Sequence, residues 1–324
     1  MKKSLKIVLF SVSAIVLALA VLVGTAMNRL SKAAGESFSL AELVKQSLSG
    51  EMKLKGVTNI LLLGIDNEDP GSDGHNGNAD GIMLVSVNAD TRELILTSFM
   101  RDTKVSVSDY RRDKLTTVYH DGGIEEFLPV FEKNFGIAVD HYAIFNYFDI
   151  IDLVDALGGI DIDVADEEIP DIEAKIRAVA DKKGVDYVDY LINWYGPGVI
   201  HFNGLQTAGY LRIRPAYGNY DSGRTERARY VVSRLMETLS GKPVSEMIDF
   251  AGMLYSQIET DMPESETMKL ALNAGRIMRY DRISDKIPMD GTYSSEDNGS
   301  GYYAVPDFEV NNAHLYASIY EGKH

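Results

Sequence analysis

Long apolar runs and shorter amphipathic stretches divide the chain into a hydrophobic N-terminal segment and a mixed body. Residues 7–27 carry no charged side chain, and three lysines precede them within residues 1–6. A helix rises about 1.5 Å per residue, so this run can span the roughly 30 Å hydrocarbon core of a bilayer, whereas the apolar part of a cleaved signal peptide is only about 7–15 residues long. Lysines on the N-terminal side favour a cytoplasmic tail. We therefore expect a signal anchor at 7–27 and a single-pass protein of the cell membrane with its C-terminal body outside.

Three apolar runs bounded by turn-forming residues follow a polar spacer that we expect at 28–56. The first run is continuous, which is typical of a buried strand, and it ends at a loop rich in Asn, Asp and Gly. The next two runs are joined by Asn88-Ala-Asp-Thr, a good hairpin connection. The pattern predicts strands at 57–66, 82–87 and 94–99.

Helical and strand periods alternate through the rest of the body. Helices are expected at 122–135, 148–157, 203–210 and 224–239, and strands at 142–147 and 160–164. Mixed strands and helices in this order predict an α/β (α+β) fold, with a mixed central sheet flanked by helices. We expect one domain at 57–241 and a C-terminal helical or irregular extension of the same body at 242–324, with a Ser/Gly-rich loop at 291–301.

Composition excludes several classes of protein. The chain has no cysteine, which rules out disulfides, thiolate metal sites and a cysteine nucleophile. A net charge of −16 argues against general nucleic-acid binding, which needs a basic surface. The six histidines show no metal-ligand spacing, and no P-loop, dinucleotide fingerprint or nucleophile elbow is present.

Arginine is concentrated in one segment of this acidic chain. The 25 residues from Tyr210 to Arg234 hold six arginines. Arg212 and Arg214 would share a face if extended, and Arg224 and Arg227 would share a face of a helix. Guanidinium groups match phosphate oxygens in pairs, so two one-sided pairs predict a convergent anion site. The alternative is a solvated surface of salt-bridged arginines.

A second group of candidate residues lies where strands begin and end. Asp80 precedes the strand at 82–87, and Arg101 and Asp102 follow the strand at 94–99. An arginine beside an aspartate can bind phosphate while the carboxylate holds a divalent cation. The alternative is a local turn with a salt bridge, and for Asp80 alone a turn or capping role.

Taken together in order and spacing, these segments resemble the LytR-CpsA-Psr family of envelope glycopolymer transferases from about Asn59 to Leu239. The resemblance is carried by Leu61–Asp66, by Ala79-Asp-Gly-Ile-Met83, by Thr97-Ser-Phe-Met-Arg-Asp102, by Leu157-Gly-Gly-Ile-Asp161, and by Arg212, Arg214, Asp221, Arg224 and Arg227 in the arginine-rich segment.

The resemblance implies a phosphotransferase that moves a glycopolymer phosphate from a polyprenyl-pyrophosphate carrier to peptidoglycan, outside the membrane of a Gram-positive-type envelope. It implies Mg²⁺ (or Mn²⁺) held by Asp80 and Asp102, and an apolar pocket for the polyprenyl tail. The implied catalytic residues are Arg101, Asp102, Arg212 and Arg214, and the implied pyrophosphate-binding residues are Arg101, Arg212, Arg214, Asp221, Arg224 and Arg227. Asp102 or Asp66 would take the proton of the acceptor hydroxyl.

The chain departs from the family pattern at several positions. Met100 replaces the usual proline of the family, Gly81 the usual threonine and Ala228 the usual glutamine. Glu68 stands where, in the family, an arginine often follows the turn at Asp66. Two rival functions therefore stay open: a hydrolase that uses water as the acceptor, and a non-catalytic prenyl-phosphate-binding regulator of the envelope. A third interpretation is an anchored structural protein with an arginine-rich surface.

Overall fold

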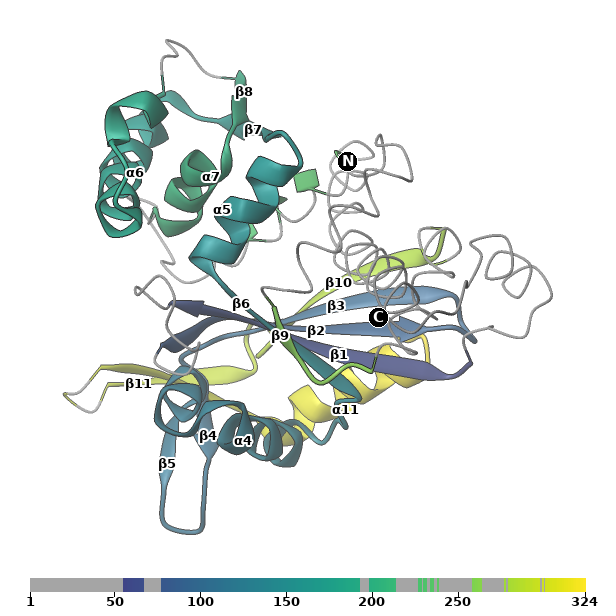
Figure 1. Ribbon diagram of the computed structural model, residues 1–324. Helices are drawn as coiled ribbons and strands as arrows, with labels where there is room; N and C mark the ends of the chain where they lie inside the picture. Colours follow the sequence, from purple (N-terminus) through teal and green to yellow (C-terminus); the bar gives the residue numbers. More distant parts are fainter. Residues whose placement is uncertain are drawn as a thin grey trace, which may run out of the picture. The chain divides into compact units, whose positions relative to one another are not determined.

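The computed structural model describes residues 55–66, 77–192, 198–213, 258–263, 279–297 and 301–324, with single or paired positions from 227 to 238 and at 277 and 299 (Figure 1). The anchor predicted at 7–27 and most of the spacer predicted at 28–56 lie outside these residues. Within the described ranges, no helix has the length and apolar character of a membrane span. The chain divides into a sheet unit (Lys55–Asn146 and Tyr280–His324) and a helical unit within Tyr147–Arg279.

The sheet unit contains a mixed sheet in the order β10-β3-β2-β1-β6. Its strands are β1 (Val57–Asp66), β2 (Asn78–Asn88), β3 (Glu93–Phe99), β6 (His141–Asn146) and β10 (Asp281–Ile287). β2 runs antiparallel to β1 and β3, whereas β6 pairs with β1 and β10 pairs with β3 in parallel. The predicted mixed sheet and the first four of these strands are confirmed, each within a few residues of its expected bounds.

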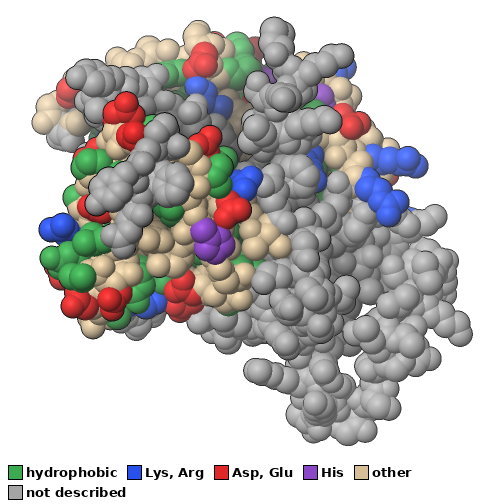
Figure 2. Space-filling view, turned by 90° about the horizontal axis from the view of Figure 1, so that it is seen from above, with side chains coloured by type: hydrophobic (Ala, Val, Ile, Leu, Met, Phe, Trp, Pro, Cys, Tyr) green, Lys and Arg blue, Asp and Glu red, His purple; other side chains and the backbone are tan. Residues whose placement is uncertain are grey.

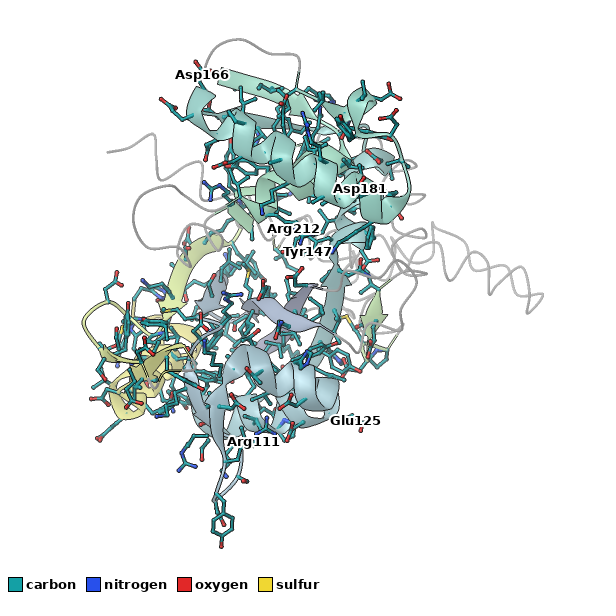
Figure 3. The ribbon with its side chains drawn as sticks, turned by 90° about the vertical axis from the view of Figure 1, so that its left-hand side faces the viewer. Arg111, Glu125, Tyr147, Asp166, Asp181 and Arg212 are labelled. Atoms are coloured by element: carbon teal, nitrogen blue, oxygen red, sulfur yellow. The ribbon has the colours of Figure 1, made fainter. Side chains whose placement is uncertain are left out.

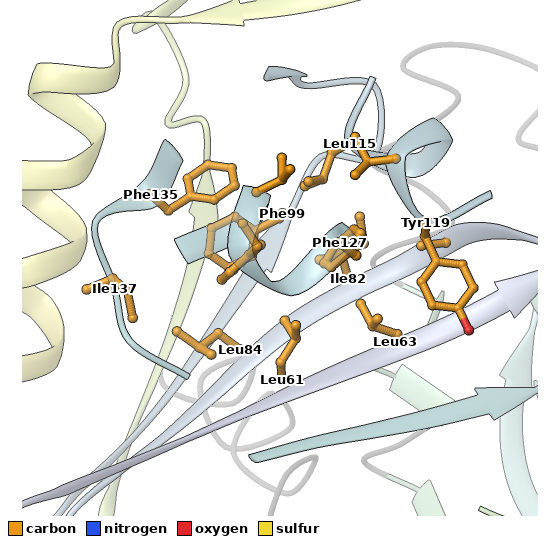
Figure 4. Packing of buried hydrophobic residues seen from close by; sticks show 14 of the residues in the cluster. Leu61, Leu63, Ile82, Leu84, Phe99, Leu115, Tyr119, Phe127, Phe135 and Ile137 are labelled. Atoms are coloured by element: carbon orange, nitrogen blue, oxygen red, sulfur yellow. The ribbon is translucent and has the colours of Figure 1, made fainter. Parts of the chain in front are cut away.

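Helices α4 (Leu115–Phe135) and α11 (Phe308–Tyr320) cover one face of this sheet, and they pack against each other (Figure 1). The core between them and the sheet is aromatic: the ring of Phe99 meets those of Phe131 and Phe135 edge-on, with centroids 4.7 and 4.6 Å apart (Figure 4). Such edge contacts stabilise a core beyond the apolar area that they bury. α4 begins seven residues before the predicted helix because the helix continues through a kink at Gly123, whose φ is 61°.

Two short ribbons complete the sheet unit. β4 (Lys104–Ser106) pairs with β5 (Arg112–Lys114), and β11 (Tyr293–Asp297) pairs with β12 (Tyr302–Pro306), both antiparallel. The prediction of a loop at 291–301 is therefore wrong for 293–297, which bond to β12 in register. The extension expected after residue 242 contributes strands β10, β11 and β12 as well as a helix, and β10 joins the central sheet.

Among its described residues, the helical unit contains three packed helices and a two-stranded ribbon. Its described elements are α5 (Tyr147–Ala156), β7 (Ile160–Val164), η2 (Asp166–Glu168), α6 (Ile169–Lys183), η3 (Tyr187–Tyr190), β8 (Gly198–Phe202), α7 (Gly204–Arg212) and the short β9 (Glu259–Thr260). The predicted helix end at Gly158 and Gly159 is confirmed, with φ of 83° and 100°. The predicted cap is confirmed too: Asn203 accepts from the Gln206 amide at 2.9 Å, and Gln206 accepts from the Asn203 amide at 3.0 Å. α6 was not predicted.

The described surface carries its charge in many small groups. Figure 2 shows acidic side chains at several separate places among neutral and hydrophobic ones, with lysines and arginines also in small groups. This distribution agrees with the net charge of −16. The described part of this face shows no broad basic surface, so a phosphate-binding site there would be a local arrangement of cations.

Candidate active site

One edge of the sheet collects the charged residues of the sheet unit. β1, β3, β6 and β10 all run in the same direction, so their carboxyl ends lie at this edge, where the antiparallel β2 begins. Asp66 is the last residue of β1, Asp80 is the third residue of β2, and Arg101 and Asp102 follow β3. Open α/β sheets bind ligands at the carboxyl ends of their strands. The topology thus places the predicted residues where a ligand site is expected.

At this edge, carboxylates and cations alternate in a row that we call the charge array: Asp80, Arg101, Asp102 and Lys114. Arg101 Nη1 donates to Asp80 Oδ1 at 2.5 Å, and Arg101 Nε lies 3.5 Å from Asp102 Oδ2. Lys114 Nζ donates to Asp102 Oδ1 at 2.6 Å. The four side chains are between 9% and 24% exposed. Partly buried charges interact more strongly than exposed ones, so each member of the array fixes the orientation of the next.

The backbone around Arg101 and Asp102 is held from three sides. The Thr116 amide in the first turn of α4 donates to the Arg101 carbonyl at 3.0 Å, and the Ala304 amide of β12 donates to the Asp102 carbonyl at 2.9 Å. The Met100 amide donates to the carbonyl of Ile287, the last residue of β10, at 2.9 Å. A proline, which the family has at this position, has no N–H and could not make that bond.

The glycine at position 81 is not demanded by space. Gly81 lies opposite Gly64 in the register of β1 and β2, next to an irregularity between Gly64 and Ile65. A Cβ built on Gly81 would meet the Gly64 Cα at 3.6 Å, an ordinary van der Waals distance. The departure from threonine therefore removes a hydroxyl beside Asp80 without relieving a clash.

Lys114 and Tyr303 belong to this site, and sequence reasoning missed both. Lys114 Nζ lies 5.2 Å from the centroid of the Tyr303 ring, close enough for a cation–π interaction, and Lys104 Nζ lies 5.6 Å from the same centroid. Lys114 ends β5 and caps α4, and Tyr303 lies in the C-terminal ribbon. Lys114 belongs to no recognised sequence motif, so its position before a helix did not mark it as a site residue. Tyr303 lies far from Lys114 in the sequence, so no local pattern predicts their contact.

The carboxylates of the charge array fit a small divalent cation if the substrate supplies the remaining ligands of its coordination sphere. Asp80 and Asp102 supply hard carboxylate oxygens, and both contact the same guanidinium. Among the described residues there is no group of three or more His, Cys, Asp or Glu side chains that could hold a metal. Mg²⁺ is usually held by one or two carboxylates together with phosphate oxygens and water, so two carboxylates are enough only when a phosphate binds with the metal.

The arginines of the helical unit are in a different environment. Arg212 is the last residue of α7, so the extended backbone under which Arg212 and Arg214 would share a face is not present at Arg212. Its guanidinium lies 4.9 Å from the centroid of the Tyr147 ring (Figure 3). Arg214, Asp221 and Arg224 lie outside the described residues, so their predicted roles stay predictions. Arg227 lies within them, and Ala228, the departure next to it, is described as well.

Arg227 is bound within its own unit. Its Nη2 donates to Glu168 Oε1 at 2.7 Å, its Nη1 donates to the Ile213 carbonyl at 3.4 Å, and it lies 5.6 Å from the centroid of the Tyr210 ring. Burial raises the pKa of the Tyr210 phenol, and the carboxylate of Glu168 raises it further. These contacts tie η2 and α7 together, so Arg227 stabilises the helical unit.

His201 joins the turn after α5 to the ribbon of β7 and β8. Its Nδ1 lies 2.8 Å from Asp161 Oδ1 and its Nε2 lies 2.8 Å from the Gly158 carbonyl. Both partners are acceptors, so the doubly protonated ring satisfies both, and the hydrogen bonds to Asp161 and Gly158 raise the pKa of His201. His201 therefore has a structural role, linking the turn after α5 to the ribbon of β7 and β8.

The chain resembles known proteins in sequence and in fold. The LytR_cpsA_psr family model matches residues 23–315. The chain is 28% identical over 276 residues to the polyisoprenyl-teichoic acid–peptidoglycan teichoic acid transferase TagU of Enterococcus faecalis, covering 83% of this chain and 82% of that protein. It is 27% identical over 267 residues to the corresponding transferase TagV of Bacillus subtilis, covering 78% and 64%, and 26% identical over 248 residues to the regulatory protein MsrR of Staphylococcus aureus, covering 76% and 68%.

Solved structures show the same fold. TagT bound to LIIa-WTA superposes with a TM-score of 0.61 at 19% identity, covering 82% of this chain and 90% of that one. The crystal structure of B. subtilis TagV superposes with a TM-score of 0.60 at 22% identity, covering 82% and 98%. At these identities the likeness concerns the fold and carries no statement about individual side chains.

Proposed function

The chain belongs to the LytR_cpsA_psr family, and from this premise we propose that it transfers a glycopolymer phosphate from a polyprenyl-pyrophosphate carrier to peptidoglycan. Two relatives named as teichoic acid–peptidoglycan transferases support the reaction type. The observation that carries the proposal for this chain is the charge array of Asp80, Arg101, Asp102 and Lys114 at the ligand-binding edge of the sheet. The proposal includes an anchor at 7–27 and a body outside the membrane, supported by the uncharged run and the lysines before it.

The reaction asks the protein mainly to place and neutralise charge. A peptidoglycan hydroxyl attacks the phosphorus that bears the glycan, and the bond from that phosphorus to the polyprenyl phosphate breaks. Negative charge spreads over the non-bridging oxygens and the leaving phosphate in the transition state. Arg101 binds those oxygens, and its contacts with Asp80 and Asp102 hold the guanidinium in place beforehand. Preorganised cations stabilise developing charge without reorganising during the reaction.

Lys114 adds a second positive charge beside Asp102. We assign it a positioning role, because its ammonium group fixes the Asp102 carboxylate while Tyr303 limits its own position. Asp80 and Asp102 would hold Mg²⁺ or Mn²⁺, which when bound would neutralise charge on the phosphate oxygens. The proton of the acceptor hydroxyl goes to one of the two carboxylates considered for this step, Asp66 or Asp102.

The proposal keeps the arginine-rich segment as further pyrophosphate ligands, supported by the family resemblance of Arg212, Arg214, Arg224 and Arg227, with Asp221 beside them. Arg212 ends α7, and its guanidinium stacks on the Tyr147 ring. A stacked guanidinium keeps its positive charge and its N–H donors, so Arg212 can still bind an anion. Arg227 could bind a phosphate only by exchanging its ion pair with Glu168, so we expect its substitution to lower stability as well as activity.

Product analysis tests the proposal. The full-length protein in detergent is mixed with a polyprenyl-pyrophosphate oligosaccharide, a peptidoglycan oligomer and Mg²⁺, and the products are weighed by mass spectrometry. The proposal expects peptidoglycan that carries the glycan through a phosphodiester. Free glycan phosphate without a linked acceptor would identify the hydrolase instead. Unchanged lipid retained by the protein would identify the binding regulator, a candidate supported by the similarity to MsrR.

A further inference from the structure

The ribbon of β4 and β5 carries cations on one of its faces. In its register Lys104 pairs with Lys114, and Ser106 pairs with Arg112. Residues directly opposite in an antiparallel ribbon point to the same face, and residues two apart on one strand do so as well. These four side chains therefore form one face, which we call the cationic face. It runs from Lys114 in the charge array toward the turn of the ribbon, which projects from the sheet unit in Figures 1 and 3.

The pairing of Lys104 with Lys114 works against stability. Like charges directly opposite in a ribbon repel each other and destabilise it. The fold compensates with a separate partner for each: Glu296 accepts from Lys104 Nζ at 2.5 Å, and Asp102 accepts from Lys114 Nζ at 2.6 Å. The Tyr303 ring lies near both ammonium groups. The two ammonium groups therefore stay side by side at the inner end of the cationic face, each with one carboxylate partner.

Two adjacent arginines at the outer end of the ribbon, Arg111 and Arg112, differ in their ion pairing. Arg111 contacts the carboxylates of Asp113, Asp121 and Glu126, and these contacts brace the ribbon against α4. Arg112 is exposed, and its Nη1 donates to the carbonyls of Ser108 at 2.9 Å and Arg111 at 3.5 Å. Within the part of the chain that the structure describes, Arg112 forms no ion pair, so its charge is available to an anion from solution.

Tyr110 sits at the turn with its side chain fully exposed, at 100%. The turn is nevertheless ordered by hydrogen bonds: the amides of Tyr110 and Arg111 donate to Ser108 Oγ at 3.4 and 3.1 Å, and the Val107 amide donates to the Arg111 carbonyl at 3.0 Å. A ring held on an ordered turn loses little conformational entropy when a ligand covers it. The face of an aromatic ring suits the C–H groups of a sugar or alditol.

We propose that the cationic face, with Tyr110 at its outer end, binds the glycopolymer that is being transferred, as a chain of sugars or alditols joined by phosphates. The inference rests on the proposed function and adds to it a route for the polymer away from the charge array. Alternate residues of a strand lie about 7 Å apart, so Arg112 presents its charge to an anionic group of the polymer one step outward from Lys114, whose own charge is paired with Asp102. The glycan strands of peptidoglycan have no phosphates in their backbone, so they lack the regularly repeated anion that a phosphate-linked polymer offers. A membrane surface fits less well, because Tyr110 is a single aromatic residue with Asp109 next to it.

The test compares two lipid-linked substrates that differ only in the polymer. One carries the linkage sugars alone, and the other carries the same sugars extended by several glycerol-phosphate units. The full-length variants Tyr110→Ala and Arg112→Gln are each expected to raise the KM for the extended substrate about tenfold, the first through loss of a ring contact and the second through loss of a charged hydrogen bond, while the short substrate keeps its wild-type kcat and KM. Lys133→Gln removes one exposed charge from α4 and Tyr316→Ala one exposed ring from α11, and both controls should leave the two substrates unchanged.

A binding measurement keeps this inference separate from the proposed function, because it needs no transfer. Calorimetry with free glycerol-phosphate oligomers should show about tenfold weaker binding to Arg112→Gln than to the wild type or to Lys133→Gln. Three results would overturn the inference: equal losses on the short and the extended substrate, binding of an uncharged N-acetylhexosamine oligomer that depends on Tyr110, or unchanged oligomer binding with lost binding to phosphatidylglycerol vesicles.

Discussion

Lys114 shows how a single residue completes the site from outside any motif. Its ammonium group donates to Asp102 and lies against Tyr303, so it links the start of α4 to the C-terminal ribbon. The Asp80–Arg101–Asp102 group that sequence spacing predicted is confirmed as a set of contacts. What sequence could not supply was the cation on its far side, because that cation comes from a neighbouring ribbon and owes its place to the register of β4 and β5.

The first prediction concerns that lysine. Lys114→Met is expected to lower kcat/KM for transfer about 10- to 100-fold, since a hydrogen bond to a charged group contributes about 1.5–3 kcal/mol. Initial rates with the lipid-linked substrate measure this. Lys133→Met, which removes one exposed charge elsewhere on α4, serves as the matched control. A rate equal to that of the control would remove Lys114 from the site.

Met100 gives a second prediction at the scale of one residue. Its amide donates to the Ile287 carbonyl, so Met100→Pro removes a bond between the site and β10. We expect a loss of about 1–3 kcal/mol in the free energy of unfolding, because a buried carbonyl loses its donor. Met100→Leu keeps the N–H and should stay close to the wild type. Urea unfolding of the two variants decides the point, and equal midpoints would show that the bond contributes nothing.

At the scale of elements, sequence reasoning was accurate where an element depends on residues close together in the sequence, and it failed where the element depends on distant partners. The run at 57–66 could be read as a buried strand because β1 is covered on both faces, and Asn203 could be read as a cap because its partner Gln206 is three residues away. α4 was predicted too short, because Gly122 and Gly123 look like a helix end although the helix continues through the kink. The ribbon of β11 and β12 was missed because β11 is polar and mostly exposed, so it shows no apolar alternation, although it pairs with β12 in register.

The junction of α5, β7 and β8 leads to a prediction about pH. The carboxylate of Asp161 and the carbonyl of Gly158 raise the pKa of His201. The contribution of the charged ring to stability is therefore complete below the ordinary pKa of about 6.5, and it is lost as the pH rises through the raised value of the folded state. Asp161→Asn should lower the pKa of His201 in an NMR titration of its ring protons. Asp163→Asn, two residues along the same strand, should leave it unchanged, and an identical shift in both variants would refute the assignment.

At the scale of the whole molecule, the C-terminal residues are part of the core of the sheet unit. Ile287 in β10 and Leu315 and Ile319 in α11 are fully buried in the same cluster as Leu61 and Phe99. The segments that carry the family resemblance in the sequence analysis end near Leu239, so those segments alone assign no role to the C-terminal residues, although the family model extends to residue 315. Their burial, and the contact of Tyr303 with Lys114, make the C-terminal segment necessary for both the fold and the site.

Truncation of one of these side chains tests that claim. Leu315→Ala is expected to lower the free energy of unfolding by about 2–5 kcal/mol, the range for removing a buried leucine side chain. Val310→Ala changes an exposed position of the same helix, 44% accessible, and should fall within about 0.5 kcal/mol of the wild type. Chemical denaturation of both variants measures the difference. Similar stabilities for the two would mean that α11 does not belong to the core.

Transfer by an Arg101→Ala variant is the measurement that tests the central claim most directly. Wild-type protein, Arg101→Ala and Arg101→Lys are compared for peptidoglycan-linked product under the same conditions, with circular dichroism and urea unfolding to check the fold. We expect Arg101→Ala to lose at least about 100-fold in rate while remaining folded, and Arg101→Lys to recover only part of that loss, because a lysine keeps the charge but not the paired donors. Full transfer activity in a folded Arg101→Ala variant would contradict the assignment of the charge array as the active site.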